Sequence, residues 1–174
     1  EGRAKNSNDL TQPAILKMMA MGGEGSIIDR LKQLHIAPLA ISYEYDPCDY
    51  LKAREYQLRR DIPYWKKTAE DDLESMLVGI KGYKGHIFYK CAPCIDEWLD
   101  TVDEDLPKNK LFDAIAAHID HEIHCNYKLY PVNYVALDMI QDTRVYEEYY
   151  TAEDYQNFNA YLDGQIEKIE IENR

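Results

Sequence analysis

The first five residues, Glu1, Gly2, Arg3, Ala4 and Lys5, combine a carboxylate, a flexible backbone position and two cations. Glycine lets a backbone come close to a ligand. An arginine can bind a phosphate through two parallel hydrogen bonds, and a lysine adds a compact positive charge. The pentapeptide is therefore a candidate phosphate-binding segment. A solvated chain end is the other interpretation, because chain ends are usually poorly ordered.

Two cysteines form a second candidate site. Cys91 and Cys94 are separated by two residues and follow a predicted strand. In thioredoxin-like proteins such a pair precedes a helix, whose N-terminus lowers the thiol pKa and activates the thiol for redox chemistry. That fold needs further strands after the pair, whereas this chain becomes helical. The spacing alone is common, so a structural or incidental pair is favoured, and a redox module is the alternative.

Three histidines, His118, His121 and His124, follow one another at intervals of three on a predicted helix. Each interval shifts the side-chain direction by about 60°, so the three side chains do not converge well on one metal ion. His121 with Cys125, or His118 with Glu122, would be better spaced. The favoured interpretation is that these histidines are simply polar residues along a helix, and we assign no metal ligand.

Three acidic residues, Glu44, Asp46 and Asp49, follow an apolar run that is predicted to be a strand. Carboxylates at the end of a strand could serve acid–base or metal chemistry. The simpler interpretation is a polar loop in which Asp49 caps the next helix.

The elements that must position these residues follow from apolar spacing and capping signals. Residues 36–43 are apolar with almost no alternation, which is typical of a strand buried on both faces, and a second strand is predicted over 86–90. Helices are predicted from Pro13 to Met19, from Ser26 to Leu34, from Asp49 to Arg59, from Thr68 to Ile80, from Pro107 towards Tyr130, from Val132 to Ile140 and over Phe158 to Ile169.

These elements predict an α/β fold: a partial, mostly parallel sheet flanked by helices, followed by a mainly helical C-terminal extension. Residues 1–100 would be the C-terminal part of the α/β domain, and 101–174 a helical extension packed on it.

The composition argues against several classes of function. The chain of 174 residues has 32 acidic and 20 basic side chains, a net charge of -12 that argues against nucleic-acid binding. No apolar run reaches the roughly 18 residues that span a bilayer, and no signal peptide is visible. Four scattered cysteines favour a reducing cytoplasm over a disulfide framework. The sequence starts without Met inside a motif-like peptide, so we expect it to be part of a longer protein.

Residues 1–5, E-G-R-A-K, together with residues 34–42, L-H-I-A-P-L-A-I-S, resemble the third and fourth sequence blocks of the glycerolipid acyltransferase family. The family's third block reads F-P-E-G-T-R-S, or E-G-R-S-K in some members, and its fourth is a short strand of the V-P-[IV]-x-P-V kind. Residues 42–49 and 124–133 also resemble one bacterial branch of the family, so the resemblance covers most of the chain.

The resemblance implies a transfer of a fatty acyl group from an acyl thioester to the hydroxyl of glycerol 3-phosphate, lysophosphatidate or a related lipid. It places Glu1, Gly2, Arg3 and Lys5 at the acceptor phosphate and Pro38 at the fourth-block position. The donor would be acyl-CoA or an acyl carrier protein thioester, with no further cofactor. The intact protein would be cytoplasmic, at the inner face of the cell membrane, with a membrane surface as a partner and no nucleic acid.

The family's catalytic H-x-x-x-x-D motif does not occur in this sequence. Five residues after the five histidines stand Ala40, Cys91, Ile123, Asn126 and Leu129. In the implied mechanism the motif's histidine deprotonates the acceptor hydroxyl, which then attacks the thioester. This chain would then hold part of the acceptor site and no base, and we expect it to be inactive alone. A non-catalytic helical interaction domain is a further alternative.

Overall fold

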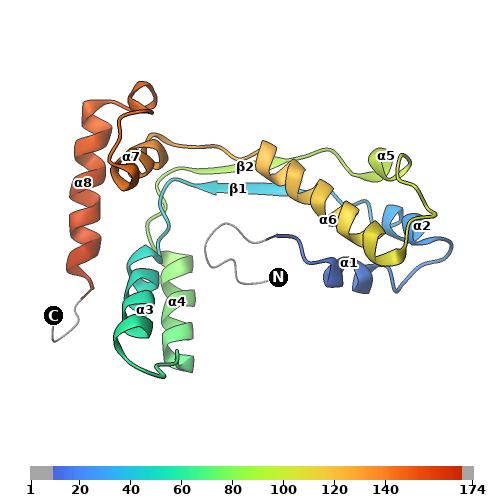
Figure 1. Cartoon of the computed structure of the whole chain (residues 1–174), viewed down its shortest axis with the longest axis horizontal. Helices are drawn as coiled ribbons and strands as arrows, with labels where there is room; N and C mark the ends of the chain where they lie inside the picture. The colour runs from blue at the N-terminus through green and yellow to red at the C-terminus, as the bar shows by residue number, and fades with distance from the viewer. Residues whose placement is uncertain (1–9, 170–174) are drawn as a thin grey trace. The chain divides into compact units, whose positions relative to one another are not determined.

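Figure 1 shows the computed structural model of the chain. The structure describes residues 10–169. These residues form eight α-helices, one short 3-10 helix and one two-stranded antiparallel sheet. The chain divides into two compact units, each made from two separate segments. The first unit contains residues 10–41 and 89–128, and the second contains residues 42–88 and 129–169.

The first unit contains α1 (Pro13–Met19), α2 (Ile27–Lys32), α5 (Asp96–Leu99) and α6 (Lys108–Cys125). Local signals set the two N-terminal helices. Pro13 opens α1, where its missing amide costs nothing. Ser26 caps α2: its hydroxyl accepts a hydrogen bond from the Asp29 amide at 3.2 Å, and the Asp29 carboxylate accepts one from the Ser26 amide at 2.9 Å. Both helices were predicted and are confirmed.

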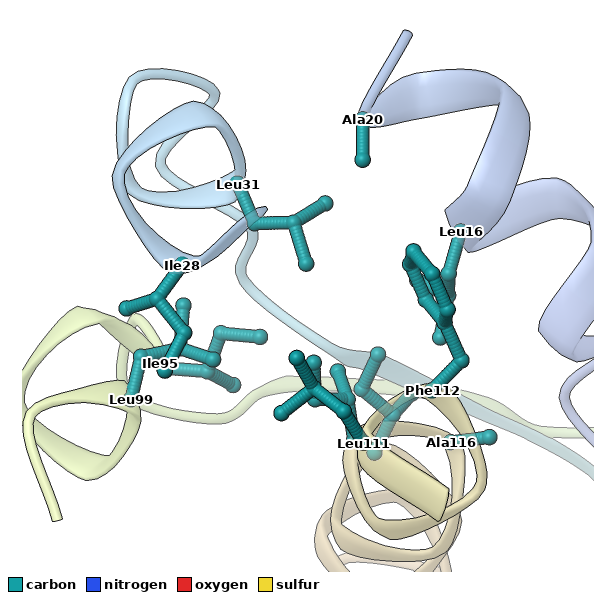
Figure 2. Packing of buried hydrophobic residues seen from close by; sticks show 11 residues of the cluster. Leu16, Ala20, Ile28, Leu31, Ile95, Leu99, Leu111, Phe112 and Ala116 are labelled. Atoms are coloured by element: carbon teal, nitrogen blue, oxygen red, sulfur yellow. The ribbon is translucent and has the colours of Figure 1, made fainter. Parts of the chain in front are cut away.

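The core of the first unit gathers apolar side chains from these four helices (Figure 2). Leu31 of α2, Leu99 of α5 and Ile115 of α6 are each 0% exposed. The remaining members of the cluster are Leu16, Ala20, Ile28, Ile95, Leu111, Phe112, Ala116 and Ile119. Leu111, Ile115 and Ile119 form an apolar stripe along α6 that faces this core.

The second unit contains α3 (Asp49–Asp61), α4 (Ala69–Lys81), α7 (Pro131–Gln141), the 3-10 helix η1 (Glu147–Tyr149) and α8 (Ala152–Glu167). α4 begins with a capping box: the Thr68 hydroxyl accepts from the Asp71 amide at 3.2 Å, and the Asp71 carboxylate accepts from the Thr68 amide at 2.8 Å. α3 and α4 form a helical hairpin (Figure 1).

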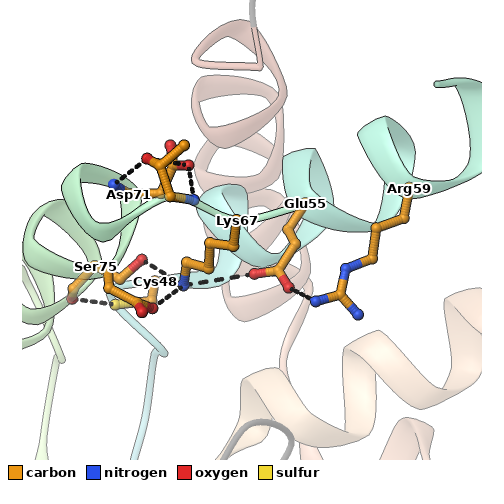
Figure 3. A network of polar contacts seen from close by, with 8 residues as sticks. Cys48, Glu55, Arg59, Lys67, Asp71 and Ser75 are labelled. Atoms are coloured by element: carbon orange, nitrogen blue, oxygen red, sulfur yellow. Dashed lines mark hydrogen bonds and ion pairs between the residues drawn. The ribbon is translucent and has the colours of Figure 1, made fainter. Parts of the chain in front are cut away.

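Polar contacts hold this hairpin together (Figure 3). The Lys67 ammonium lies just before α4 and donates to the Ser75 hydroxyl at 3.2 Å. It also forms an ion pair with Glu55 of α3 at 3.5 Å, and Glu55 pairs in turn with Arg59 at 2.6 Å. No residue of α3 or α4 is fully buried, so these polar contacts accompany apolar side chains that are at most partly buried.

A buried carboxylate organises the segment between α7 and α8. Asp138 is 2% exposed and accepts hydrogen bonds from the Thr143 hydroxyl at 2.8 Å, the Tyr150 hydroxyl at 3.0 Å and the Tyr146 amide at 3.1 Å. Burial alone would raise the pKa of Asp138, but these hydrogen bonds outweigh it and lower the pKa. Asp138 therefore stays ionised and fixes the turn that carries η1.

The predicted mostly parallel sheet flanked by helices is wrong. β1 (Leu39–Tyr43) and β2 (Ile87–Cys91) pair with each other in an antiparallel arrangement. The cause is the connection between them: a single crossover helix gives a parallel pair, whereas the α3–α4 hairpin returns the chain to its starting end. The expected burial on both faces is also wrong, because only Ala40 and Ser42 of β1 are buried and the alternate residues are exposed.

None of the helices within residues 10–169 combines the length and the apolar character that crossing a bilayer requires.

Replacing Leu31 tests the packing of the core in the first unit, and Leu34, which lies outside this core, provides the control. We expect Leu31→Ala to lower the free energy of unfolding by about 2–5 kcal/mol, because it leaves a cavity among packed side chains. Leu34 is 46% exposed, so Leu34→Ala should cost less than about 1 kcal/mol. Urea denaturation followed by circular dichroism measures both. Equal costs for the two variants would contradict the packing in Figure 2.

Candidate functional site

The predicted phosphate-binding residues Glu1, Gly2, Arg3 and Lys5 lie outside the described residues. Pro38 lies immediately before β1 and is buried. Its carbonyl accepts a hydrogen bond from the Ala92 amide at 2.8 Å, one position beyond the end of β2. Because a proline has no amide to donate, the start of a strand is a position that it tolerates well.

The three histidines of α6 have separate surroundings. His118 stacks on the Trp98 ring with centroids 3.9 Å apart, and burial lowers the pKa of His118. His121 contacts Cys125, with 3.6 Å between Nε2 and Sγ, the pairing that the helical spacing favoured. The His124 ring lies beside that of Tyr127, with centroids 5.7 Å apart, so the three histidines contact different neighbours.

The acidic residues after β1 are each engaged with a different partner. Glu44 accepts a hydrogen bond from the His86 amide at 2.8 Å, and its carboxylate lies 2.6 Å from His86 Nδ1. Asp46 pairs with Lys52. The predicted helix cap at Asp49 is wrong, because Cys48 occupies the cap position and Asp49 is the first residue of α3.

Asp49 instead belongs to a polar network with α8. Its carboxylate accepts from the Tyr161 hydroxyl at 2.6 Å and from the Gln165 amide nitrogen at 2.9 Å. Burial and the hydrogen bond to Asp49 raise the pKa of Tyr161 far above its ordinary value. The Lys168 ammonium donates to Gln165 at 2.5 Å and lies over the Tyr50 ring.

This network forms part of the wall of a cavity of about 480 Å³ within the second unit. The other lining residues are mostly aromatic or aliphatic, and they include Pro47, Val78, Tyr83 and Ala160. A mostly apolar cavity with a few polar groups is typical of sites for small ligands. This arrangement was not predicted, because Asp49 and α8 are more than a hundred residues apart in the sequence.

A second unpredicted cluster lies in the first unit, where His35, Cys94 and Asp96 come together. His35 Nδ1 lies 2.6 Å from Asp96 Oδ2, and the ligand atoms of all three side chains lie within 4.8 Å of one another. Cys94 and Cys91 are both exposed and have free thiols. The antiparallel register places residue 35 opposite the residues that follow β2. A correct prediction of this register would therefore have indicated the cluster.

The electrostatics of the cluster do not favour an activated thiol. The Asp96 amide lowers the pKa of Cys94, but desolvation and the Asp96 carboxylate outweigh it, so the pKa of Cys94 is raised. The pKa of Asp96 is lowered, first by the His35 ring and then by the Cys94 thiol beside it. A redox-active thiol needs a lowered pKa, so these surroundings do not favour Cys94 as the attacking thiol of a redox pair.

Comparison of the chain with models of protein families, with curated protein sequences and with solved structures gives no match.

Replacing Tyr161 should test the network at the cavity. Tyr161→Phe removes the hydroxyl that Asp49 accepts from, and we expect a loss of about 1–2 kcal/mol of unfolding free energy at pH 7. Because the pKa of Tyr161 is raised in the folded state, its contribution is complete below about pH 10 and falls as the pH rises further. Urea denaturation at pH 7 and at higher pH measures both effects.

The control is Tyr64→Phe, because Tyr64 is 97% exposed and should change stability little at either pH. A cost for Tyr161→Phe no larger than that for Tyr64→Phe would contradict the network.

Proposed function

We propose that the chain is part of a glycerolipid acyltransferase, which moves a fatty acyl group from an acyl thioester to the hydroxyl of glycerol 3-phosphate, lysophosphatidate or a related acceptor. The observation that carries the proposal is the order of two sequence blocks: E-G-R-A-K at residues 1–5, then the strand that begins after Pro38. Arg3 and Lys5 would bind the acceptor phosphate, and the catalytic base would come from sequence upstream of Glu1. The chain alone would be inactive.

The position of Pro38 immediately before β1 supports the proposal, because the family's fourth block is a short strand with a proline near its beginning. The cavity beside Tyr161 adds support, because its mostly apolar wall could receive the hydrocarbon chain of a substrate. Lys168 supplies a cation at the wall of this cavity, which suits an amphiphile with an anionic head group.

We also propose that the intact protein is cytoplasmic and contacts the inner face of the cell membrane through α4. Four side chains of this helix, spaced as one apolar stripe, are each at least half exposed: Leu73, Met76, Leu77 and Ile80. An amphipathic helix can lie in a membrane interface with such a stripe in the lipid. The net charge of -12 disfavours electrostatic attraction to anionic lipids, so the apolar stripe would supply the affinity.

The role of Arg3 can be tested in the intact protein. We expect Arg3→Ala to raise KM for the glycerol-phosphate acceptor about tenfold or more, because a charge-assisted hydrogen bond to the phosphate is lost. KM for the acyl thioester should not change. Lys66→Ala is the matched control, since it removes an exposed cation elsewhere and should leave both constants unchanged.

Two results would contradict the proposal. One is a reading frame upstream of Glu1 that lacks an H-x-x-x-x-D motif. The other is an equal effect of Arg3→Ala on the two substrates, which would indicate a general loss of structure and no acceptor contact.

The membrane contact of α4 can be tested by vesicle co-sedimentation. Met76 and Leu77 are 58% and 50% exposed, so the double variant Met76→Glu, Leu77→Glu should fold normally. We expect it to reduce binding to phosphatidylcholine vesicles by about tenfold or more, because two side chains no longer enter the lipid.

Ile140→Glu is the matched control for this experiment. It also converts an exposed apolar helical residue to an acid, at a side chain that is 82% exposed on α7. Equal losses for the control and the double variant, or no vesicle binding by the unmodified chain, would overturn the proposed contact.

A further inference from the structure

We infer that His35, Cys94 and Asp96 form a binding site for one divalent metal ion of the zinc class, with a coordination position left open to solvent. The three side chains supply an imidazole, a thiol and a carboxylate, whose ligand atoms lie within 4.8 Å of one another. This donor set suits zinc, whereas magnesium and calcium prefer oxygen ligands alone.

An oxygen of Asp96 gives an independent indication. The Oδ1 atom is buried and accepts no hydrogen bond from the described residues, while Oδ2 contacts His35. Buried polar atoms without a partner are rare in folded proteins, because removing them from water costs free energy that a contact must offset. A metal ion held by this carboxylate would provide that contact.

The backbone holds the cluster in place from both sides. The Ala92 amide donates to the Pro38 carbonyl at 2.8 Å, and the Ile95 amide donates to the Ile36 carbonyl at 3.0 Å. These two bonds join the segment that carries Cys94 to the segment that follows His35. Ile95 is itself 1% exposed, so the core of Figure 2 anchors the residue between Cys94 and Asp96.

Two further features fix the backbone at His35. His35 has a left-handed backbone with φ of 49° just after the end of α2, a common way for a helix to end, and its amide donates to the Lys32 carbonyl at 3.1 Å. Close by, the Lys32 ammonium pairs with Asp100 at 2.5 Å, which ties the end of α2 to the residue that follows α5. The backbone segments that carry the three ligands are thus held by packed and hydrogen-bonded neighbours.

The distances need only small changes for metal binding. In tetrahedral zinc sites the bonds are about 2.0–2.3 Å, which separates neighbouring ligand atoms by roughly 3.3–3.8 Å. His35 Nδ1 and Asp96 Oδ2 are closer than this, at 2.6 Å, because they share a proton. On binding, the metal takes the place of that proton, and the Cys94 thiol loses its own proton to become a thiolate. The His35 side chain is 78% exposed and free to rotate by the small amount required.

Cobalt(II) titration of the 174-residue chain tests the site, because a cobalt–thiolate bond absorbs in the near ultraviolet. We expect one equivalent of cobalt to produce this absorption and zinc to abolish it, with no effect of magnesium. Cys94→Ser should abolish the absorption. His35→Asn and Asp96→Asn should each weaken zinc binding by about 100-fold or more, measured by competition, because each removes a direct ligand.

Two matched controls separate this site from its alternatives. Cys91→Ser changes the other thiol of the pair, and Glu97→Gln changes an exposed acid of α5; both should bind zinc within about threefold of the unmodified chain. Circular dichroism checks that every variant keeps its helices. No cobalt–thiolate absorption in the unmodified chain would overturn the inference. Equal losses of the cobalt–thiolate absorption in Cys91→Ser and Cys94→Ser would also overturn the inference, since the two cysteines would then be the ligands.

Discussion

The antiparallel pairing of β1 with β2 is the interaction on which the rest of the structure depends. Backbone hydrogen bonds continue beyond both ends of the strands, from Glu44 with His86 at 3.0 Å to Ile36 with Ile95 at 3.0 Å. Within the first unit this register brings His35 to the residues that follow β2. Within the second unit it closes the long connection that carries α3 and α4. Both local arrangements follow from one register, because each backbone pair fixes which side chains lie opposite each other.

The helices could be predicted from the sequence because their signals are local. Pro13 opens α1, the Ser26 and Thr68 capping boxes start α2 and α4, and an apolar stripe marks the buried face of α6. The strands were also located within one to three residues. The direction of strand pairing was predicted incorrectly, because an apolar run of this length fits a parallel or an antiparallel sheet. The number of helices between the two strands decides which of these forms. The alternating burial of β1 follows from that pairing, with the small side chains Ala40 and Ser42 on the covered face.

The candidate sites could not be predicted from the sequence either, because each combines residues that lie far apart along the chain. His35 and Asp96 are 61 positions apart, and Asp49 and Tyr161 are 112 apart, so no spacing rule joins either pair. The C-x-x-C pair did draw attention to Cys94, but through redox chemistry. Its surroundings instead place a thiol beside a carboxylate and an imidazole, with ligand atoms within 4.8 Å of one another, and this donor set suits a zinc-class metal ion. The proposed acyl transfer and the inferred metal site rest on different residues, so each can fail without the other.

Amide hydrogen exchange at Ala92 and Ile95 tests the register most directly. These two amides donate to Pro38 and Ile36 and hold the Cys94 segment beside the segment that follows His35. We expect both to exchange slowly, with protection close to that of the buried helix α6, because their hydrogen bonds break only when the first unit opens. Exchange at the rate of an unstructured loop would contradict the register and, with it, the geometry of the His35, Cys94 and Asp96 cluster.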